Sequence, residues 1–462
     1  MIAAVALDLG STSIKAGLLD QQGNLSGIVS QPVPPVQAQG GRYESDALAY
    51  AETADQVLQT CLAQAEGFPP LGLCSQRSSF LIWEKSSGKP VTPLISWQDN
   101  RGAESCVALQ KQESFITALS GLRLTPYFFA TKLHVVLQEN PGWREKLQSG
   151  VWMTGTLDTF LLWRWTGGKQ HITDVSMAAR TLLMDIGKQQ WSPVLCDLFG
   201  IPLGILPEIK SSTGMHVPLT NGLTLQASLA DQSAALVASV GDDRDVALVN
   251  LGTGGFVIRY LADEHADTGG YLRTLVYRDN TRQAYIAVEG TLNSIAAALA
   301  PYPVADCTID DFATNDIFCL AEPSGLGAPF FRKDLALQFS APVAHLSQKE
   351  IACLLLEAII FRVVRILEDF HSNSCIKRVY LSGGLSELSC LQQGIALCVP
   401  FEVFRLQQKD ASLQGAAMLA CSIKFNPEKA AGKVQASQKN AALPQKYLRW
   451  KLWLDVLLKA KA

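Results

Sequence analysis

The sequence predicts an α/β protein of two domains. At 462 residues the chain is longer than one hydrophobic core usually organises, so two domains of about 200 residues each are expected. Its composition of 48% hydrophobic and 18% charged residues is typical of a soluble protein with well-buried sheets. A pattern of strand, small-residue turn and strand opens the chain at Val5 and returns at Val246, so the two domains are expected to begin alike.

Composition and charge narrow the class of protein and its partners. A net charge of −3 gives no reason to expect nucleic acid or an anionic membrane as a partner. The 11 cysteines include no CxxC pair, which favours a reducing compartment over a disulfide framework or a zinc ribbon. The apolar start MIAAVALDLG carries Asp8 and is interpreted as a buried strand rather than a signal peptide. No apolar run reaches about 18 residues, so no membrane span is expected, and we predict a cytoplasmic protein.

Hydrophobic periodicity predicts the elements of the first half. Apolar runs bounded by turn residues predict strands over residues 5–9, 14–19, 25–29, 71–74, 80–83 and 91–97. Apolar residues at helical spacing predict helices over residues 47–65, 131–138 and 156–165. The first three strands are expected to form a β-meander.

The same criteria apply to the second half. Strands are predicted over residues 246–251, 256–261 and 378–382, and helices over 352–370, from about 386, and over 447–458. The helix at 352–370 is apolar nearly all round, which indicates a central buried helix.

A polar break at residues 241–245 separates the halves, so we predict domains over 1–240 and 241–462. The basic tail from Lys424 to Lys461 is interpreted as a solvated surface helix, and contact with a membrane or a partner is the alternative.

The first turn of the chain has the composition of a phosphate-binding turn. Asp8 ends the first strand and is followed by Gly10, Ser11, Thr12 and Ser13. Backbone N–H groups and hydroxyls in such a turn can bind phosphate, while the acid orients a hydrated Mg²⁺. An ordinary hairpin is the alternative.

A second copy of this turn favours the phosphate interpretation. It contains Gly252, Thr253 and Gly254, and two facing hairpins can clamp one polyphosphate. Neither GxxxxGK nor GxGxxG after a strand occurs, so the P-loop and Rossmann classes lose their main support.

Asp231 stands at the start of a helical pattern, with apolar neighbours. A helix N-terminus favours the ionised carboxylate. Asp231 is therefore a candidate base for the hydroxyl proton in phosphoryl transfer, which needs positioning more than basicity. Plain helix capping is the alternative.

Several polar and aromatic residues of the first half fall in predicted loops. They are Gln76, Arg77, Trp97, Asp99 and Tyr127. Together they suit a polyhydroxylated ligand, because polar groups bind hydroxyls and aromatic faces bind C–H patches. Taken singly, each also fits a surface salt bridge or a core aromatic.

Gly383 and Gly384 precede a predicted helix. They suit an adenine that lies against the backbone, or alternatively close packing of a strand on a helix.

The ordered set of motifs resembles the FGGY family of carbohydrate kinases. The resemblance covers roughly residues 1–422 and rests on LDLGSTSIKAGLLD, SQRSSFLIWEKSSGKPVTPLISWQD, LTPYFFATKLHVVL, GTLDTFLLWRWTGG, TDVSMAARTLLMDI, LADQSAAL, VNLGTGGFVI, SGLGAPFF and LSGGLSELSCLQQGIAL. It implies two ribonuclease-H-like (actin-like) domains, with ATP and Mg²⁺ in the cleft between them, and makes a homodimer plausible.

The same resemblance implies roles for single residues. Asp231 matches the family's catalytic base and Asp8 its metal-orienting acid, which acts through water. Thr12 and Thr253 fall in the two phosphate-binding turns, and Gly383 and Gly384 lie where adenosine is held. Residues that contact substrate in glycerol kinases of the family match Arg77, Trp97, Tyr127, Asp231 and Phe256.

The chain also departs from the family pattern. Glycerol kinases carry Gln-Arg-Glu where this chain has Gln-Arg-Ser78, and the missing carboxylate argues against glycerol. Ala230 replaces the usual Gly before the catalytic acid. The interval between Gly290 and Ser324 is shorter than usual, with 293–301 in place of the common Gln-Trp helix, which is expected to alter contacts to the nucleotide.

We therefore predict an ATP-dependent kinase that phosphorylates a hydroxyl group of a small sugar (a ketose) or a polyol. The alternative is a nucleotide-binding regulator of the same fold without catalysis, which the shortened interval suggests. The presence of Asp8, Asp231 and both turns argues against it. Actin-like polymerisation is a third hypothesis, but it gives Arg77, Trp97 and Tyr127 no ligand to bind and is therefore not favoured.

Overall fold

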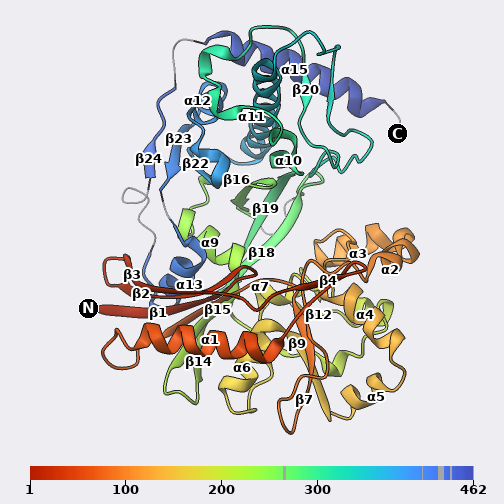
Figure 1. The fold of residues 1–462 in the computed structure, drawn as a ribbon, viewed down its shortest axis with the longest axis vertical. Helices are drawn as coiled ribbons and strands as arrows, with labels where there is room; N and C mark the ends of the chain where they lie inside the picture. Colours follow the sequence, from red (N-terminus) through yellow and green to blue (C-terminus); the bar gives the residue numbers. More distant parts are fainter. Residues whose placement is uncertain (264–266, 408, 425–430, 437–439, 461–462) are drawn as a thin grey trace. The chain divides into compact units, whose positions relative to one another are not determined.

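The computed structural model describes residues 1–263, 267–407, 409–424, 431–436 and 440–460, which form two compact units (Figure 1). The first unit contains residues 1–238, 274–285 and the described part of 410–425. The second contains 239–273, 286–409 and the described part of 426–462. The chain first changes unit close to the domain boundary predicted after residue 240. Two later segments that the prediction assigned to the second domain, 274–285 and 410–425, lie in the first unit.

A six-stranded mixed sheet forms the centre of the first unit. Its order is β14-β15-β6-β1-β2-β3, with β1 Ile2–Leu9, β2 Ser13–Asp20, β3 Leu25–Pro32, β6 Leu71–Ser75, β14 Thr213–Pro218 and β15 Thr224–Ala230. The strands β1, β2 and β3 form the predicted antiparallel meander, and β6 runs parallel to both β1 and β15. The carboxyl ends of β1, β6 and β15 therefore meet at one edge of the sheet, where polar side chains of three distant segments come together.

Helices α1 (Ala47–Leu62) and α13 (Ala411–Cys421) cover opposite faces of this sheet (Figure 1). Asp46 caps α1 by accepting hydrogen bonds from two backbone amides of the first turn, which satisfies donors that a helix start leaves unpaired. The buried face of α1 includes Tyr50, Val57 and Leu58, at the helical spacing that the sequence shows.

A smaller five-stranded sheet lies beside further helices of the first unit. Its order is β4-β5-β8-β7-β9, with β4 Gln37–Gln39, β5 Arg42–Ser45, β7 Phe80–Glu84, β8 Leu94–Ile95 and β9 Trp152–Thr156. The strand predicted over 91–97 is reduced to two residues, because Pro90 and Pro93 offer no N–H to a neighbouring strand.

The other elements of this unit are short. The helices are α2 Ala103–Ala108, α3 Glu113–Ser120, α4 Phe129–Glu139, α5 Trp143–Gln148, α6 Leu157–Trp165, α7 Val175–Ala178, α8 Pro193–Leu198 and α9 Asp231–Val240. The remaining strands are β10 Ile172–Asp174, β11 Met184–Asp185, β12 Gln190–Trp191 and β13 Glu208–Lys210. The predicted helices over 131–138 and 156–165 are confirmed as α4 and α6.

A seven-stranded sheet of order β18-β19-β17-β16-β22-β23-β24 forms the centre of the second unit, although residues 274–278 of β18 and 284–285 of β19 are assigned to the first unit. Its strands are β16 Val246–Leu251, β17 Gly255–Tyr260, β18 Leu272–Arg278, β19 Ala284–Leu292, β22 Arg378–Ser382, β23 Glu402–Leu406 and β24 Ala431–Lys433. Strand β16 pairs antiparallel with β17 and parallel with β22. In the same way, β1 pairs antiparallel with β2 and parallel with β6. The predicted repeat of the opening pattern is confirmed in the hydrogen bonding of both sheets.

The longest helix, α11 (Gln348–Asn373), is the central buried helix that the sequence predicts. It begins with a capping box between Ser347 and Glu350, and its residues from Ile351 to Leu367 are nearly all buried. Its neighbours include α10 Ile295–Leu299, α12 Ser389–Cys398 and α15 Ala442–Lys459, together with the short strands β20 Cys319–Leu320 and β21 Gln338–Phe339. No helix among the described residues is long and apolar enough to cross a membrane.

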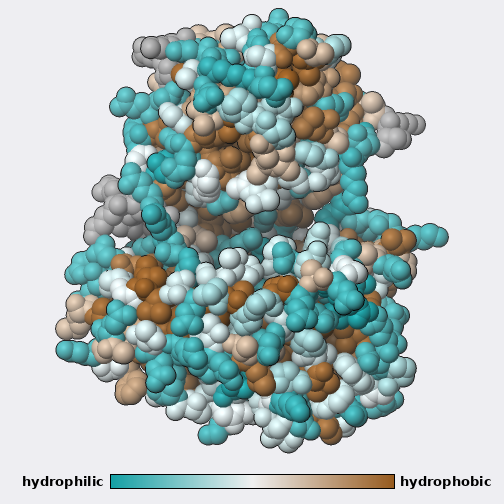
Figure 2. Space-filling view, in the orientation of Figure 1, coloured by the Kyte–Doolittle hydropathy of each residue, from teal (hydrophilic) through white to brown (hydrophobic). Residues whose placement is uncertain are grey.

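The C-terminal helix α15 differs from the solvated surface helix that the basic tail predicts. It buries Leu443, Trp450 and Leu454 in the core of the second unit, and its Lys446 is also buried, where it pairs with Glu357. Figure 2 shows hydrophilic and hydrophobic residues mixed on the surface of this unit. Tail residues 425–430, 437–439 and 461–462 lie outside the described residues.

Candidate active site

The turn between β1 and β2 exposes the small polar residues that the sequence singles out. Ser11 and Thr12 are exposed. The carbonyl of Gly10 accepts hydrogen bonds from the hydroxyl of Tyr50 (2.7 Å) and from Nε2 of Gln76 (3.0 Å). Side chains from α1 and from the end of β6 therefore fix the start of the turn, while its hydroxyls remain accessible.

Asp8 lies beside this turn at the end of β1. Burial raises its pKa to about 6, and the negative charge of Asp231 adds to this, while a hydrogen bond from Ser412 opposes it. Ser412 Oγ donates to Asp8 Oδ2 at 2.5 Å. Among the described residues, Asp8 Oδ1 is buried and has no hydrogen-bond partner. Lys15 on β2 also lowers the pKa of Asp8 and forms an ion pair with Asp410.

Asp231 is the first residue of α9, as predicted, and follows β15 directly. Its side chain retains 31% exposure. Burial raises its pKa, and the nearby positive charges of Arg77 and Arg180 oppose that rise. Arg77 Nε lies 3.9 Å from Asp231 Oδ1, and the carboxylate accepts a hydrogen bond from the backbone N–H of Gln232 at 2.7 Å. The helix start therefore contributes to its ionisation, but the guanidinium groups contribute more.

A cavity of about 360 Å³ in the first unit brings most of the predicted residues of that unit together. Those on its wall are Ser11, Gln76, Arg77, Trp97, Tyr127 and Asp231. The side chains of Trp97 and Tyr127 are 38% and 49% exposed, so their aromatic surfaces are available to a ligand. Two larger hollows on the same unit, about 680 and 630 Å³, contain none of the predicted residues, so volume alone does not identify the site.

The cavity also contains residues that the sequence interpretation missed as ligand contacts, namely Ser78, Thr125, Phe128, Arg180 and Gln232. The guanidinium carbon of Arg180 lies 5.4 Å from the centre of the Phe128 ring, within the range of a cation–π contact. Ser78 Oγ donates to the carbonyl of Arg180 at 3.1 Å. The segment 173–185 gave no clear periodicity, and its TDVSMAART motif was the one signal that could have drawn attention to Arg180.

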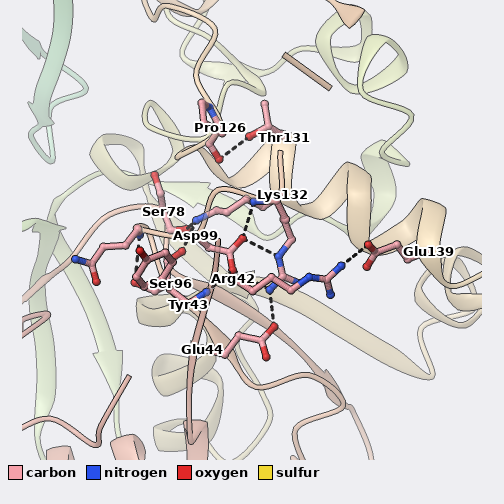
Figure 3. Close-up of polar contacts among 12 residues, drawn as sticks. Arg42, Tyr43, Glu44, Ser78, Ser96, Asp99, Pro126, Thr131, Lys132 and Glu139 are labelled. Carbon is pink, nitrogen blue, oxygen red and sulfur yellow. Dashed lines mark hydrogen bonds and ion pairs between the residues drawn. The ribbon is translucent and has the colours of Figure 1, made fainter. Parts of the chain in front are cut away.

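Asp99 does not line this cavity. Its carboxylate is fully buried, and it accepts hydrogen bonds from Arg101 Nε (2.8 Å) and from the backbone N–H of Tyr43 (2.8 Å). Burial raises its pKa, but these hydrogen bonds outweigh burial and hold the pKa below its usual value. Arg101 also forms an ion pair with Glu44. Asp99 therefore belongs to a buried network that supports the loop after Trp97, and it is not part of the wall of the site (Figure 3).

Lys132 connects the same network to the cavity (Figure 3). This side chain of α4 is fully buried and donates hydrogen bonds to the carbonyls of Ser78 (2.8 Å) and Ser96 (2.7 Å). Ser78 itself lines the cavity, and Ser96 directly precedes the cavity residue Trp97. Burial lowers the pKa of Lys132 to about 7. One amino group therefore fixes the spacing of two loops that line the site.

The second unit contains the other predicted nucleotide-binding residues. Thr253 is exposed in the turn between β16 and β17, where the N–H of Gly252 donates to the carbonyl of Gly254 at 2.8 Å. Phe256, on β17, is half-buried and belongs to this unit, whereas the cavity described above is made by residues of the first unit.

Gly383 directly follows β22 and has a backbone conformation that favours glycine. Its φ is +86°, and a Cβ atom there would lie 2.4 Å from the carbonyl oxygen of Leu251. At Gly384, in contrast, a Cβ atom would meet nothing within 4 Å. The first glycine is therefore required by close packing on the end of β16, whereas the second leaves open space beside the backbone.

The shortened interval is held by a buried ion pair. Arg362 of α11 donates from Nε to Glu322 Oε1 at 2.8 Å, and both side chains are 1% exposed. Glu322 Oε2 accepts hydrogen bonds from the backbone N–H groups of Asn293 and Gly327. Both ends of the interval are thus attached to the central helix through one carboxylate.

Family profiles match this architecture from residue 3 to residue 423. The N-terminal domain of the FGGY family of carbohydrate kinases matches residues 3–250, and the C-terminal domain of that family matches residues 247–423. The chain belongs to the FGGY family of carbohydrate kinases. The glycerol kinases of Alteromonas mediterranea and Ectopseudomonas mendocina are each 30% identical to this chain over 441 residues, which cover 90% of it and 89% of each relative.

Solved structures confirm the two-domain, actin-like ATPase fold of this FGGY kinase. Plasmodium falciparum glycerol kinase, solved with ADP, has a TM-score of 0.85 at 22% identity and covers 100% of this chain and 99% of its own. Xylulose kinase from Rhodospirillum rubrum has a TM-score of 0.81 at 17% identity, with 98% of both chains covered.

The family sets the reaction class of the chain. It is a carbohydrate kinase that phosphorylates a hydroxyl group of a small sugar or polyol, with ATP as the phosphoryl donor. The interpretation as a non-catalytic regulator gains no support from these comparisons.

Proposed function

We propose that Asp231 is the general base of this kinase and that the cavity around it binds the acceptor. The observation that carries the proposal is that one cavity is lined by Asp231, Arg77, Trp97 and Tyr127. A carboxylate there can accept the proton of an acceptor hydroxyl as its oxygen attacks the γ-phosphorus of ATP. The bond from the γ-phosphorus to the bridging oxygen then breaks, and ADP leaves.

Arg77 has two roles in this proposal. Its guanidinium opposes the effect of burial on the pKa of Asp231 and so favours the ionised form that a base needs. Its remaining N–H groups can donate to acceptor hydroxyls. Trp97 and Tyr127 offer aromatic surface to the C–H groups of the same ligand, and this combination suits a polyhydroxylated chain.

The two small-residue turns are proposed to bind the phosphates of ATP. Support comes from the exposed hydroxyls of Ser11, Thr12 and Thr253 and from the backbone amides of both turns, which can donate to phosphate oxygens. Gly383 and Gly384 are proposed to hold the adenosine, and the open space beside Gly384 supports this role.

Asp8 fits the role of a residue that holds Mg²⁺ through water. Its buried Oδ1 has no hydrogen-bond partner among the described residues, so it can accept one from a metal-bound water. The same residues contain no group of three or more His, Cys, Asp or Glu side chains that could hold a metal, which agrees with the preference of Mg²⁺ for waters and substrate phosphates. When bound, Mg²⁺ supplies positive charge to the β- and γ-phosphate oxygens.

The substitution Asp231→Asn tests the assignment, because it keeps the shape of the side chain and removes its basicity. We expect phosphorylation of any acceptor to fall at least a thousandfold while the Kd for ATP changes less than threefold. Turnover is measured by ADP release and nucleotide binding by calorimetry. Asp197→Asn, at an exposed position of α8, is the matched control. Full turnover in Asp231→Asn would refute the assignment.

A further inference from the structure

Two buried cysteines of the second unit have their sulfur atoms in contact. Cys307 lies in the shortened interval, directly after the 3₁₀ turn Val304–Asp306, and Cys353 lies in the second turn of α11. The thiol of Cys353 donates a hydrogen bond to Cys307 Sγ at 3.3 Å. Both are free thiols, and Cys353 is 4% and Cys307 7% exposed. The two sulfurs need to approach by only about 1.2 Å to reach bonding distance.

This contact is one of three along a single face of α11. Lys349, Cys353 and Glu357 are spaced by four residues, so they lie on the same face of the helix. Lys349 Nζ forms an ion pair with Asp311 at 2.8 Å, and Glu357 accepts a hydrogen bond from the backbone N–H of Ala313 at 2.5 Å. Interactions on both sides of Cys353 thus hold the interval against α11 and keep the two sulfurs aligned.

The environment of Cys307 differs from that of ordinary buried thiols in the chain. Cys61 and Cys319 donate to backbone carbonyls, and burial raises the pKa of both, which makes such thiols unreactive. At Cys307, the hydrogen bond from Cys353 lowers the pKa and outweighs burial. The same bond raises the pKa of Cys353, and burial adds to that rise. One sulfur therefore favours the thiolate, while the other stays protonated beside it.

The surroundings of Cys307 also affect its charge and its access to solvent. The positive charge of Lys349 helps to lower the pKa of Cys307, whereas the negative charges of Asp311 and Asp306 oppose this effect. Asp306 and Thr308, on either side of Cys307 in the chain, are exposed. Cys307 therefore lies just beneath the surface, where a small neutral oxidant reaches it more readily than a bulky reagent does.

We propose that Cys307 and Cys353 form an oxidation-sensitive dithiol, a modification site that a hydroperoxide converts reversibly into a disulfide. The thiolate of Cys307 attacks one oxygen of the peroxide, the O–O bond breaks, and the leaving oxygen takes up a proton as water or an alcohol. Cys307 is then a sulfenic acid. The sulfur of Cys353 attacks it, the S–S bond forms as the S–O bond breaks, and the thiol proton leaves with the hydroxide as water.

The reaction is balanced without any further reagent. The two thiols lose two electrons, which reduce the peroxide, and a thiol reductant reverses the change by exchange. The disulfide attaches the shortened interval to α11 and closes a loop between residues 46 positions apart, which restricts the unfolded chain. Phosphoryl transfer does not enter this inference, so it stands or falls independently of the proposed function.

Peptide mapping of the full-length protein tests the inference. The reduced protein is treated with hydrogen peroxide, its remaining thiols are alkylated after unfolding, and the digest is analysed by mass spectrometry without reduction. We expect a peptide pair joined through Cys307 and Cys353 that dithiothreitol separates. Cys307 should be oxidised at least about tenfold faster than the buried Cys319. The oxidised protein should unfold at a higher urea concentration than the reduced protein.

Three substitutions locate the reaction. Cys307→Ser should abolish the crosslink and the sulfenic acid. Cys353→Ala should abolish only the crosslink, so that the sulfenic acid at Cys307 persists and is trapped by dimedone. Cys390→Ser is the matched control, because Cys390 is a third buried thiol whose pKa the charge of Cys307 raises. This control should form the Cys307–Cys353 crosslink as the parent does.

Several results would overturn the inference. One is that Cys307 and Cys353 both remain free for alkylation at a peroxide dose that oxidises the exposed Cys375. Others are oxidation of Cys307 to a sulfinic acid without a crosslink, or a crosslink from Cys307 to Cys390. A lower urea midpoint for the oxidised protein would show that the bond does not fit the fold. The map of the unmodified sequence decides the question even if a variant fails to fold.

Discussion

At the residue scale, the proposed chemistry depends on two carboxylates whose surroundings favour the protonated form. Burial raises the pKa of Asp231 and brings that of Asp8 to about 6, and the two negative charges repel each other. Arg77 near Asp231, and Ser412 with Lys15 near Asp8, oppose this effect. Ionisation of the proposed base and of the proposed metal-holding acid therefore costs folding free energy.

Asp8→Asn should show this cost directly. Because the pKa of Asp8 is about 6 when folded and the ordinary value is 3.8, the folded state binds its proton more tightly. Its contribution to stability is therefore complete below pH 3.8 and is lost as the pH rises through 6. Without nucleotide or metal, the variant is expected to match the parent near pH 4 and to be more stable at pH 7.5 by up to about 3 kcal/mol, measured by urea unfolding.

Asp20→Asn is the control with the opposite sign. At Asp20, hydrogen bonds from Asn24 and Gln22 outweigh the effect of burial and lower the pKa. That carboxylate stabilises the fold above its ordinary pKa, so its replacement should destabilise the protein at pH 7.5. An Asp8→Asn variant that is also less stable than the parent at pH 7.5 would contradict the conclusion that the ionised Asp8 destabilises the fold.

At the scale of elements, the position of Asp231 depends on the contact between α9 and α13. A Cβ atom on Gly415 of α13 would lie 1.9 Å from the carbonyl oxygen of Ala234 on α9. The two helices touch backbone to backbone here, and α13 also packs on β1, β6 and β15. Residues more than 180 positions apart in the sequence thus fix the helix that carries the proposed base.

Gly415→Ala should therefore displace α9. We expect a loss of about 1–3 kcal/mol in unfolding free energy from the overpacked contact, together with a fall in kcat larger than any change in the Kd for ATP. Thermal unfolding and steady-state kinetics measure the two effects. Gly204→Ala, where a Cβ atom meets nothing within 4 Å, is the control and should be near neutral. If Gly415→Ala lowers the unfolding free energy but leaves kcat unchanged, then packing of α13 does not determine the geometry of the site.

At the scale of the whole molecule, each unit has its own hydrophobic core. The core of the second unit encloses the Glu322–Arg362 ion pair, which holds the shortened interval against α11. Through this pair and the hydrogen bonds to Glu322, the segment from Asn293 to Gly327 is attached to the central helix.

Glu322→Gln should lower the free energy of unfolding strongly, because it leaves the buried guanidinium of Arg362 without its counter-charge. Removing one partner of a buried pair typically costs about 3–5 kcal/mol. The loss is expected in chemical denaturation, with faster hydrogen exchange at the amides of 290–327 and α11. Asp316→Asn breaks the exposed pair with Arg449 and should cost less than about 1 kcal/mol. Equal effects of the two substitutions would argue against a structural role for the buried pair.

The sequence by itself determined the features that depend on local order. Hydrophobic periodicity located β1, β2, β16, β17 and α11, because side-chain spacing reports which face of an element is buried. The order of the motifs identified the FGGY family, and with it the reaction class. The placement of Asp231 at a helix start and of Arg77 after a strand could also be predicted, because each depends only on the residues of its own segment.

The tertiary structure decided which distant groups meet. Asp99 and Arg180 illustrate this, because neither environment can be read from neighbouring residues: Arg101 and Tyr43 bind the carboxylate of Asp99, while β15 and α9 bring Asp231 to Arg180. Segments 274–285 and 410–425 joined the first unit for the same reason. Such contacts join residues that are far apart along the chain, so they appear only once the chain is folded.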